Sequence, residues 1–279
     1  MKTILASILL AATTLHAADT PDKLIPFKPL GDKPALQLHT FLPADHKASD
    51  KRPAIIFFFG GGWAGGTPSQ FYPHCRHYAD LGLVAFAAEY RTLKSHSTGP
   101  QSCVADGKSA LRYLKAHATE LGIDPTKIIA GGGSAGGHVA ASTATITKFD
   151  DPADDTSISP VPAALVLFNP VCDNGPENGW GHAKVKAYWK DISPAHNLSA
   201  TTPPTITFLG TNDKLIPVST AERFRDTLKS HAVKTELHLY QNQGHGFFNL
   251  RNGNSEYYDK TVAAADRFLL SLALLPEKK

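Results

Sequence analysis

The chain has 279 residues, of which 42% are hydrophobic and 19% charged, and its formal net charge is +3. This composition is typical of a globular protein with a full core and excludes an intrinsically disordered chain. The small charge is not concentrated in any basic block, so the sequence does not indicate binding to nucleic acid or to a membrane surface.

The first seventeen residues differ from the rest of the chain. A positive start at Lys2 precedes an uncharged, apolar or small stretch over residues 3–15, and Ala17 ends the segment. This layout is typical of a secretory signal peptide, and it is too short to span a bilayer as a mature helix. Leu15 is larger than the small residue favoured three positions before a cleavage site, and an apolar helix of the fold is the alternative. We expect a secreted or periplasmic protein without a membrane anchor, with residues 18–279 as a single domain.

Predicted strands and helices alternate along that domain. Strands are expected at residues 36–42, 54–59, 83–90, 128–131, 163–168, 204–209 and 236–240, and helices at 102–121, 138–147, 219–230 and 257–275. Residues 54–59 are an uninterrupted apolar run, as in a central strand that is buried on both faces. The alternation predicts an α/β fold with a mostly parallel central sheet and helices on both faces. Residues 172–202 have no strong period and are expected to form a cap or a substrate-side excursion.

The three cysteines, Cys75, Cys103 and Cys172, allow at most one disulfide. Cys75 and Cys103 flank the same predicted strand and could pair, but three free, buried thiols are an equal alternative. There is no Cys-x-x-Cys motif, and His74 and His77 have no carboxylate at ligand spacing. We therefore expect neither a metal site nor a cofactor.

Residues 132–136, Gly-Gly-Ser-Ala-Gly, fit the pattern G-x-S-x-G between a predicted buried strand and a helix. A serine on so sharp a turn has a strained backbone, and its neighbours two residues away must lack a Cβ atom. The N-terminus of the following helix directs unpaired N–H groups toward negative charge that forms near the serine oxygen. Ser134 is therefore the candidate nucleophile. Taken by itself, the motif also fits a phosphate or dinucleotide loop, or merely a tight turn.

A serine nucleophile needs a neighbouring base, and the base needs an orienting carboxylate. His245 is the candidate base because it lies between two glycines, just beyond the last predicted strand, where sites in such sheets gather. Asp213 and Asp173 each follow a predicted strand, and Asp213 is the preferred acid. Ser134, Asp213 and His245 occur in the chain order of an α/β-hydrolase.

An oxyanion hole needs N–H donors near the carbonyl oxygen as it becomes negative. The residue after the nucleophile, Ala135, is expected to supply one donor. Gly61 and Gly62 are expected to supply the others, since they follow an early central strand and let the backbone approach a substrate. No Lys-Ser or Lys-Thr pair follows these glycines, which argues against a P-loop.

Four segments carry a resemblance to a known family: residues 59–63, 132–138, 210–213 and 244–247. Over residues 54–279 the chain resembles the carboxylesterases of the hormone-sensitive-lipase and acetylxylan-esterase-like group of α/β-hydrolases. The resemblance implies an α/β-hydrolase fold with the site residues already named: Ser134, Asp213 and His245 as the triad, and Gly61, Gly62 and Ala135 as the oxyanion donors. One residue departs from the family pattern. The family usually has a histidine where Phe59 stands, and that histidine braces the glycine loop.

These features predict an exported serine carboxylesterase that hydrolyses short-chain acyl esters of small molecules. Export and the resemblance extend the expected substrates to acetylated polysaccharide. Trp63, Tyr90 and Trp180 are candidates to line the substrate pocket, and packing in the core is the alternative for each of them. Two alternatives are a serine peptidase of the same superfamily, which usually carries a large extra domain, and a non-catalytic binding protein on a hydrolase fold, which would normally lack a triad member.

Overall fold

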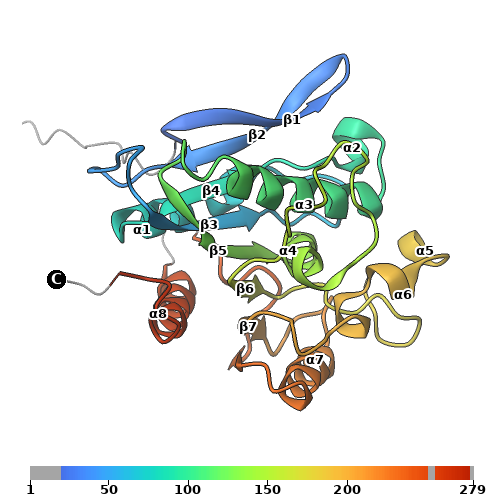
Figure 1. Cartoon of the computed structure of the whole chain (residues 1–279). Helices are drawn as coiled ribbons and strands as arrows, with labels where there is room; N and C mark the ends of the chain where they lie inside the picture. The colour runs from blue at the N-terminus through green and yellow to red at the C-terminus, as the bar shows by residue number, and fades with distance from the viewer. Residues whose placement is uncertain (1–19, 251–254, 277–279) are drawn as a thin grey trace, which may run out of the picture.

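The computed structural model describes residues 20–250 and 255–276 (Figure 1). In that part, eight strands form one sheet in the order β1-β2-β4-β3-β5-β6-β7-β8. The strands are β1 Lys23–Leu30, β2 Lys33–Phe41, β3 Arg52–Phe58, β4 Val84–Ala88, β5 Ile123–Gly133, β6 Ala164–Phe168, β7 Thr205–Gly210 and β8 Thr235–Tyr240. β1 and β2 pair antiparallel, as do β2 and β4, and all neighbouring pairs from β4 to β8 are parallel. The predicted α/β fold with a mostly parallel sheet is confirmed.

The helices cover both faces of this sheet. They are α1 Tyr72–Asp80, α2 Leu93–His96, α3 Pro100–Ala116, α4 Ala135–Thr145, α5 His182–Val185, α6 Trp189–Ile192, α7 Val218–Ser230 and α8 Glu256–Leu270, with short 3-10 turns η2 Pro68–Phe71 and η3 Pro194–His196. α3, α4 and α7 pack into one hydrophobic cluster, and α1 and α8 pack into a second cluster. In the described residues, no helix is long and apolar enough to cross a membrane.

β3 shows why an uninterrupted apolar run marks the centre of such a sheet. Successive side chains of a strand point to opposite faces. Ile56 and Phe58 belong to the cluster beneath α3 and α4, whereas Ile55 and Phe57 belong to the cluster beneath α1 and α8. All four side chains are fully buried, because helices cover both faces. This is the physical basis of the prediction for residues 54–59.

The first strand of the N-terminal hairpin differs from the prediction, whereas its second strand, β2, was expected at residues 36–42. Residues 20–34 hold four prolines and suggested an extended lead-in without regular structure, but β1 occupies much of this segment. β1 is the outermost strand of the sheet, and proline is tolerated there because one side of an edge strand needs no backbone donors. The hairpin therefore adds two antiparallel strands to the parallel sheet. The predicted signal peptide, residues 1–17, lies outside the described residues.

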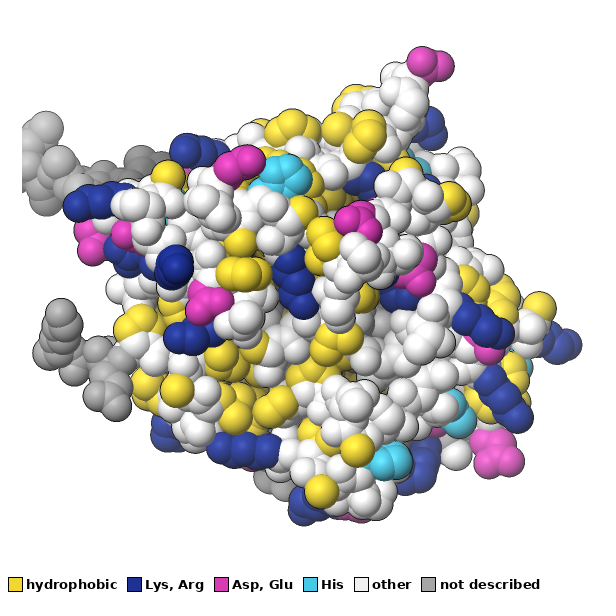
Figure 2. Space-filling view, in the orientation of Figure 1, with side chains coloured by type: hydrophobic (Ala, Val, Ile, Leu, Met, Phe, Trp, Pro, Cys, Tyr) yellow, Lys and Arg dark blue, Asp and Glu magenta, His cyan; other side chains and the backbone are white. Residues whose placement is uncertain are grey.

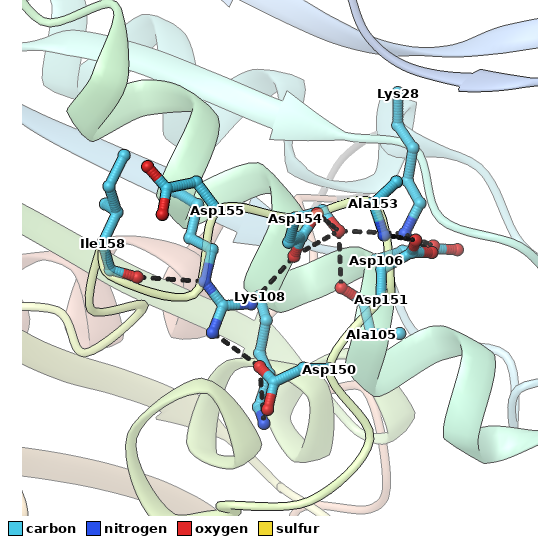
Figure 3. Close-up of polar contacts among 12 residues, drawn as sticks. Lys28, Ala105, Asp106, Lys108, Asp150, Asp151, Ala153, Asp154, Asp155 and Ile158 are labelled. Carbon is cyan, nitrogen blue, oxygen red and sulfur yellow. Dashed lines mark hydrogen bonds and ion pairs between the residues drawn. The ribbon is translucent and has the colours of Figure 1, made fainter.

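A group of buried ions holds this hairpin and the loop after α4 against α3 (Figure 3). Lys28 Nζ lies 2.8 Å from Asp106 on α3 and 2.6 Å from Asp151 in the loop. Arg112, also on α3, lies 2.5 Å from Asp150. Burial alone would raise the pKa of the Asp150 and Asp151 carboxyls, but the neighbouring cations hold both below their usual range. Because each buried charge has partners of opposite charge, this network holds the hairpin, α3 and the loop after α4 in fixed positions relative to one another.

Cys75, Cys103 and Cys172 are free and buried, so the predicted alternative of a Cys75–Cys103 disulfide is wrong. The two thiols cannot meet because the sheet separates them. Cys75 on α1 lies in the cluster on one face, and Cys103 on α3 lies in the cluster on the other. Burial raises the pKa of all three thiols, which keeps them protonated and unreactive.

Candidate active site

Ser134 lies on the turn between β5 and α4, with a backbone φ of 55° and ψ of −121°. This is a strained conformation for a residue with a side chain. A Cβ atom on Gly132 would lie 2.5 Å from the Gly136 carbonyl, and one on Gly136 would lie 2.0 Å from Phe58 O. The two glycines that the motif requires are therefore enforced by contact with the backbone. The turn presents Ser134 at the carboxyl edge of the sheet.

Asp213 and His245 come together at the same edge, after β7 and β8. His245 Nδ1 lies 2.7 Å from Asp213 Oδ2, and the Asp213 side chain is fully buried. The other carboxylate oxygen accepts hydrogen bonds from the N–H groups of Leu215 at 2.8 Å and Ile216 at 3.0 Å. Burial alone would raise the pKa of Asp213, but the hydrogen bonds from His245 and the two backbone N–H groups outweigh it and lower that pKa. Asp213 is thus held ionised behind the imidazole.

Asp173, the alternative acid, has other partners. Its carboxylate accepts a hydrogen bond from the Gly175 N–H at 2.7 Å and lies 3.5 Å from Arg223. No hydrogen bond or ion pair joins Asp173 to His245 in the described residues. Of the two candidate acids, the structure brings only Asp213 to the imidazole.

A pocket of about 780 Å³ contains both Ser134 and His245 in its wall. The described residues show no hydrogen bond between the two side chains. Instead, Asn169 Nδ2 donates to His245 Nε2 at 3.3 Å, and the Gly246 N–H donates to Asn169 Oδ1 at 3.4 Å. Asn169 directly follows β6 and was missed by sequence reasoning, although its place at the carboxyl end of a central strand is a signal that could have found it. Catalytic hydrogen bonds often form only when substrate binds, so the open arrangement is compatible with transfer from Ser134 to His245.

The glycine loop after β3 forms a second wall of this pocket. Gly61 has a φ of 129° and Gly62 a φ of 62°, both in the region that favours glycine. In the described part of the chain, the N–H groups of Gly61, Gly62 and Ala135 have no hydrogen-bond acceptor. Ala135 is itself buried, directly after Ser134. Gly61 and Gly62 therefore present unpaired N–H groups at the pocket wall, and the unpaired N–H of Ala135 directly follows Ser134.

Phe59, which stands in place of the family's histidine, is braced in another way. Its ring stacks on Tyr90 with a centroid separation of 4.1 Å and an interplanar angle of 15°. The Tyr90 hydroxyl donates a 2.6 Å hydrogen bond to the Phe59 carbonyl. Burial raises the pKa of Tyr90, so its hydroxyl remains a donor. The aromatic pair fixes the start of the glycine loop without a histidine.

A side-chain relay that the sequence did not reveal links the glycine loop to the histidine loop. Gln70 accepts a 2.6 Å hydrogen bond from the Gly60 N–H and donates to Asn249 Oδ1 at 3.0 Å. Asn249 in turn donates to the Gly246 carbonyl at 2.8 Å. Gln70 and Asn249 are far apart in the sequence, and only folding brings them together. The relay ties the candidate oxyanion hole to the candidate base.

The structure corrects the predicted substrate contacts of Trp63 and Tyr90. Both side chains are buried in the core and neither lines the pocket. Trp63 packs between His138 and Trp180, with ring centroids 5.1 and 5.2 Å away. Trp180, in contrast, does line the pocket, from the segment predicted as a substrate-side excursion.

A serine on a strand–turn–helix at the carboxyl edge of a parallel sheet, with acid and base following later strands, is the arrangement of the α/β-hydrolases. A family model described as BD-FAE matches residues 38–175, and the model of the dienelactone hydrolase family matches residues 177–275. The apo form of Thermogutta terrifontis esterase 2 superposes with a TM-score of 0.88 and is 41% identical, covering 92% of this chain and 96% of that one. The chain belongs to the α/β-hydrolase carboxylesterases of the hormone-sensitive-lipase-like group.

Other relatives agree with this assignment. Esterase 2 of Thermogutta terrifontis has also been solved with propionate or butyrate bound and phosphorylated by paraoxon. The probable carboxylic ester hydrolase LipM of Mycobacterium tuberculosis is 31% identical over 241 residues, which cover 78% of this chain and 54% of LipM. Esterase LipC of the same organism is 28% identical, over 78% of this chain and 58% of LipC. The chain thus spans about half the length of these curated relatives.

Proposed function

We propose that this protein is a serine esterase that hydrolyses short-chain carboxylic esters, with Ser134 as nucleophile, His245 as base and Asp213 as its orienting acid. The observation that carries the proposal is the 2.7 Å contact between His245 Nδ1 and the buried carboxylate of Asp213, behind a pocket that also exposes Ser134. A carboxylate at Nδ1 holds the proton there and leaves Nε2 free to accept one. Within the pocket, Ser134 is the hydroxyl that the strained turn presents to the base.

In the proposed reaction, His245 Nε2 leaves the Asn169 amide and accepts the Ser134 proton as the serine oxygen attacks the ester carbonyl. The carbonyl oxygen becomes negative and accepts hydrogen bonds from Gly61, Gly62 and Ala135. The imidazolium then donates its proton to the leaving alcohol. Water, deprotonated by the same imidazole, attacks the acyl-enzyme and releases the acid. Throughout, the ionised Asp213 stabilises the positive charge on the imidazolium.

The substrate class follows from the size and lining of the pocket. Trp180, Leu215 and Phe248 supply apolar surface, and the volume of about 780 Å³ suits a small ester rather than a triglyceride. The propionate and butyrate complexes of the similar Thermogutta esterase support short acyl chains. We extend the proposal to export and to acetyl groups on polysaccharide. The pattern of residues 1–17 supports export, and the resemblance of the motifs to acetylxylan-esterase-like proteins supports the polysaccharide.

Replacing the nucleophile tests this proposal. Ser134→Ala is expected to lower kcat for 4-nitrophenyl acetate and butyrate by about 10³-fold or more and to prevent labelling by paraoxon. Ser142→Ala is the matched control, because Ser142 lies on the same helix with a buried hydroxyl that has no partner in the described chain. Its activity should equal that of the wild type. Turnover by Ser134→Ala within tenfold of wild type would refute the assignment.

The same preparation separates the two alternatives. A 4-nitroanilide with the acyl group of the best ester tests for a peptidase, and hydrolysis of the anilide at a rate near that of the ester would favour that class. A non-catalytic binding protein would neither hydrolyse any ester nor react with paraoxon. For the wild type we expect fast ester hydrolysis, slow amide hydrolysis and stoichiometric labelling.

A further inference from the structure

The segment between β6 and β7 places an ammonium group at the wall of the pocket. Lys184, on α5, donates a 2.9 Å hydrogen bond from Nζ to the Gly62 carbonyl. The same Nζ lies 5.2 Å from the ring centroid of Trp180 and 5.8 Å from that of Trp63. Two indole rings and a carbonyl therefore fix the position of this charge. An isolated surface lysine has no such contacts, and its ammonium group moves freely.

This ammonium has no carboxylate partner. Among the described residues that line the pocket, Lys184 is the one Lys, Arg, Asp or Glu side chain. No ion pair to Lys184 occurs within residues 20–250 and 255–276. Asp213 is the nearby carboxylate in the site, but it is fully buried behind His245 and outside the pocket wall. Lys184 therefore contributes a positive potential at the pocket wall that no paired carboxylate neutralises.

The surroundings of the mouth add to this potential. Lys94 packs its side chain against Gly65 of the glycine loop, and Lys214 precedes Leu215 of the pocket wall. Neither lysine forms an ion pair in the described part of the chain. Figure 2 shows further Lys and Arg side chains that project from the region of α5 and α6. Lys94 and Lys214 thus add positive charge near the glycine loop and near Leu215.

We propose that Lys184 makes this site selective for esters that carry an anionic group, such as a carboxylate, in the acyl or the alcohol part. This inference rests on the proposed esterase function and names its substrate class. One of the three Lys184 N–H donors is used by Gly62, and the other two remain for an anion. The indole rings hold the ammonium beside the pocket, where those two donors can reach an anionic group of the substrate.

A purely structural role for Lys184 would have a different signature. Its hydrogen bond to the Gly62 carbonyl helps to hold a candidate oxyanion donor, so loss of the side chain could slow every ester. Such an effect would be the same for neutral and anionic substrates of equal shape. Selectivity for anions instead changes the ratio between the two substrates, and this ratio distinguishes the two roles.

The experiment compares two matched pairs of esters. 4-Acetoxybenzoate and 4-acetoxybenzamide differ in charge on the alcohol side, and the mono-4-nitrophenyl ester of adipic acid and 4-nitrophenyl hexanoate differ in charge on the acyl side. The kcat/KM ratio of anionic to neutral ester is measured for wild type, Lys184→Gln, Lys184→Arg and Lys186→Gln. Lys186 serves as control because it is exposed on the same segment and lies outside the pocket wall.

We expect Lys184→Gln to lower the ratio about tenfold in at least one pair, while Lys184→Arg and Lys186→Gln leave it within twofold of wild type. Raising the salt concentration should lower the wild-type ratio by more than it lowers the ratio of Lys184→Gln. A ratio that Lys184→Gln leaves unchanged in both pairs overturns the inference, even if both esters slow equally. Failure of the proposed esterase function is recognised separately, because the wild type would then hydrolyse none of the four esters.

Discussion

Acidification is expected to destabilise this protein through a buried histidine on the helix that follows Ser134. His138, in the first turn of α4, is completely buried and packs edge-on against Trp63 at 5.1 Å. Its Nε2 donates a 2.8 Å hydrogen bond to the Ile192 carbonyl, and its Nδ1 has no partner in the described part of the chain. Burial lowers the pKa of His138 to about 4, and the hydrogen bond to Ile192 opposes this only in part.

The direction of the effect follows from the two protonation equilibria. The folded-state pKa of about 4 lies below the ordinary value of 6.5, so between these values the unfolded chain binds more protons than the folded one. The stability that neutral His138 provides is therefore complete above about pH 6.5 and is lost as the pH falls toward 4. A gap of about 2.5 pH units corresponds to about 3 kcal/mol.

The assay compares wild type with His138→Gln, whose side-chain amide can still donate to Ile192 but does not titrate. Urea unfolding, followed by tryptophan fluorescence at about pH 7 and about pH 4.5, gives the unfolding free energy of each protein. Wild type should lose about 2 kcal/mol more than the variant over this interval, because the full difference is reached only below about pH 4. His74, which is also buried with a lowered pKa, is common to both proteins and cancels in the difference. Equal losses in the two proteins would refute the reasoning.

Four further substitutions have expected outcomes. Asp213→Asn should lower kcat about 10⁴-fold, whereas Asp173→Asn should lower it less than about tenfold. Steady-state kinetics of the two variants measure this difference. A larger loss in Asp173→Asn would identify Asp173 as the acid instead. Gln70→Leu removes the acceptor of the Gly60 N–H and should lower kcat about tenfold with little change in KM; an effect on KM alone would contradict a positioning role. Gly61→Ala places a Cβ atom 2.1 Å from a backbone oxygen, so activity should fall at least about 100-fold while circular dichroism stays native, and full activity would exclude this loop as the oxyanion hole.

The parts of the fold that could be predicted are those in which a short sequence pattern is explained by a single physical requirement, such as burial or a strained turn. Burial on both faces requires an apolar strand such as residues 54–59, and a strained turn requires the glycines around Ser134. The first strand of the N-terminal hairpin, β1, was missed because prolines normally break strands, and their tolerance at an edge depends on which strand is outermost. Which strand is outermost is a property of the whole sheet, so it cannot be predicted from residues 20–34 alone.

In the site, residues that follow strands could be named from the sequence, whereas contacts between loops could not. Asp213 and His245 each follow a strand, so the sheet brings them to one edge. Gln70 meets Asn249 across 179 residues, and that contact depends on the path of two loops. Trp63 was expected in the pocket because an aromatic residue after a glycine loop fits either a pocket wall or a core, and only the packed structure decides between them.

The placement of the three thiols on two sides of the sheet has a consequence for how this protein can be made. Since no covalent cross-link joins distant parts of the chain, its maturation requires neither an oxidant nor a disulfide isomerase. Production in a reducing cytosol or in an oxidising compartment should yield the same folded molecule, and dithiothreitol should leave its melting temperature unchanged.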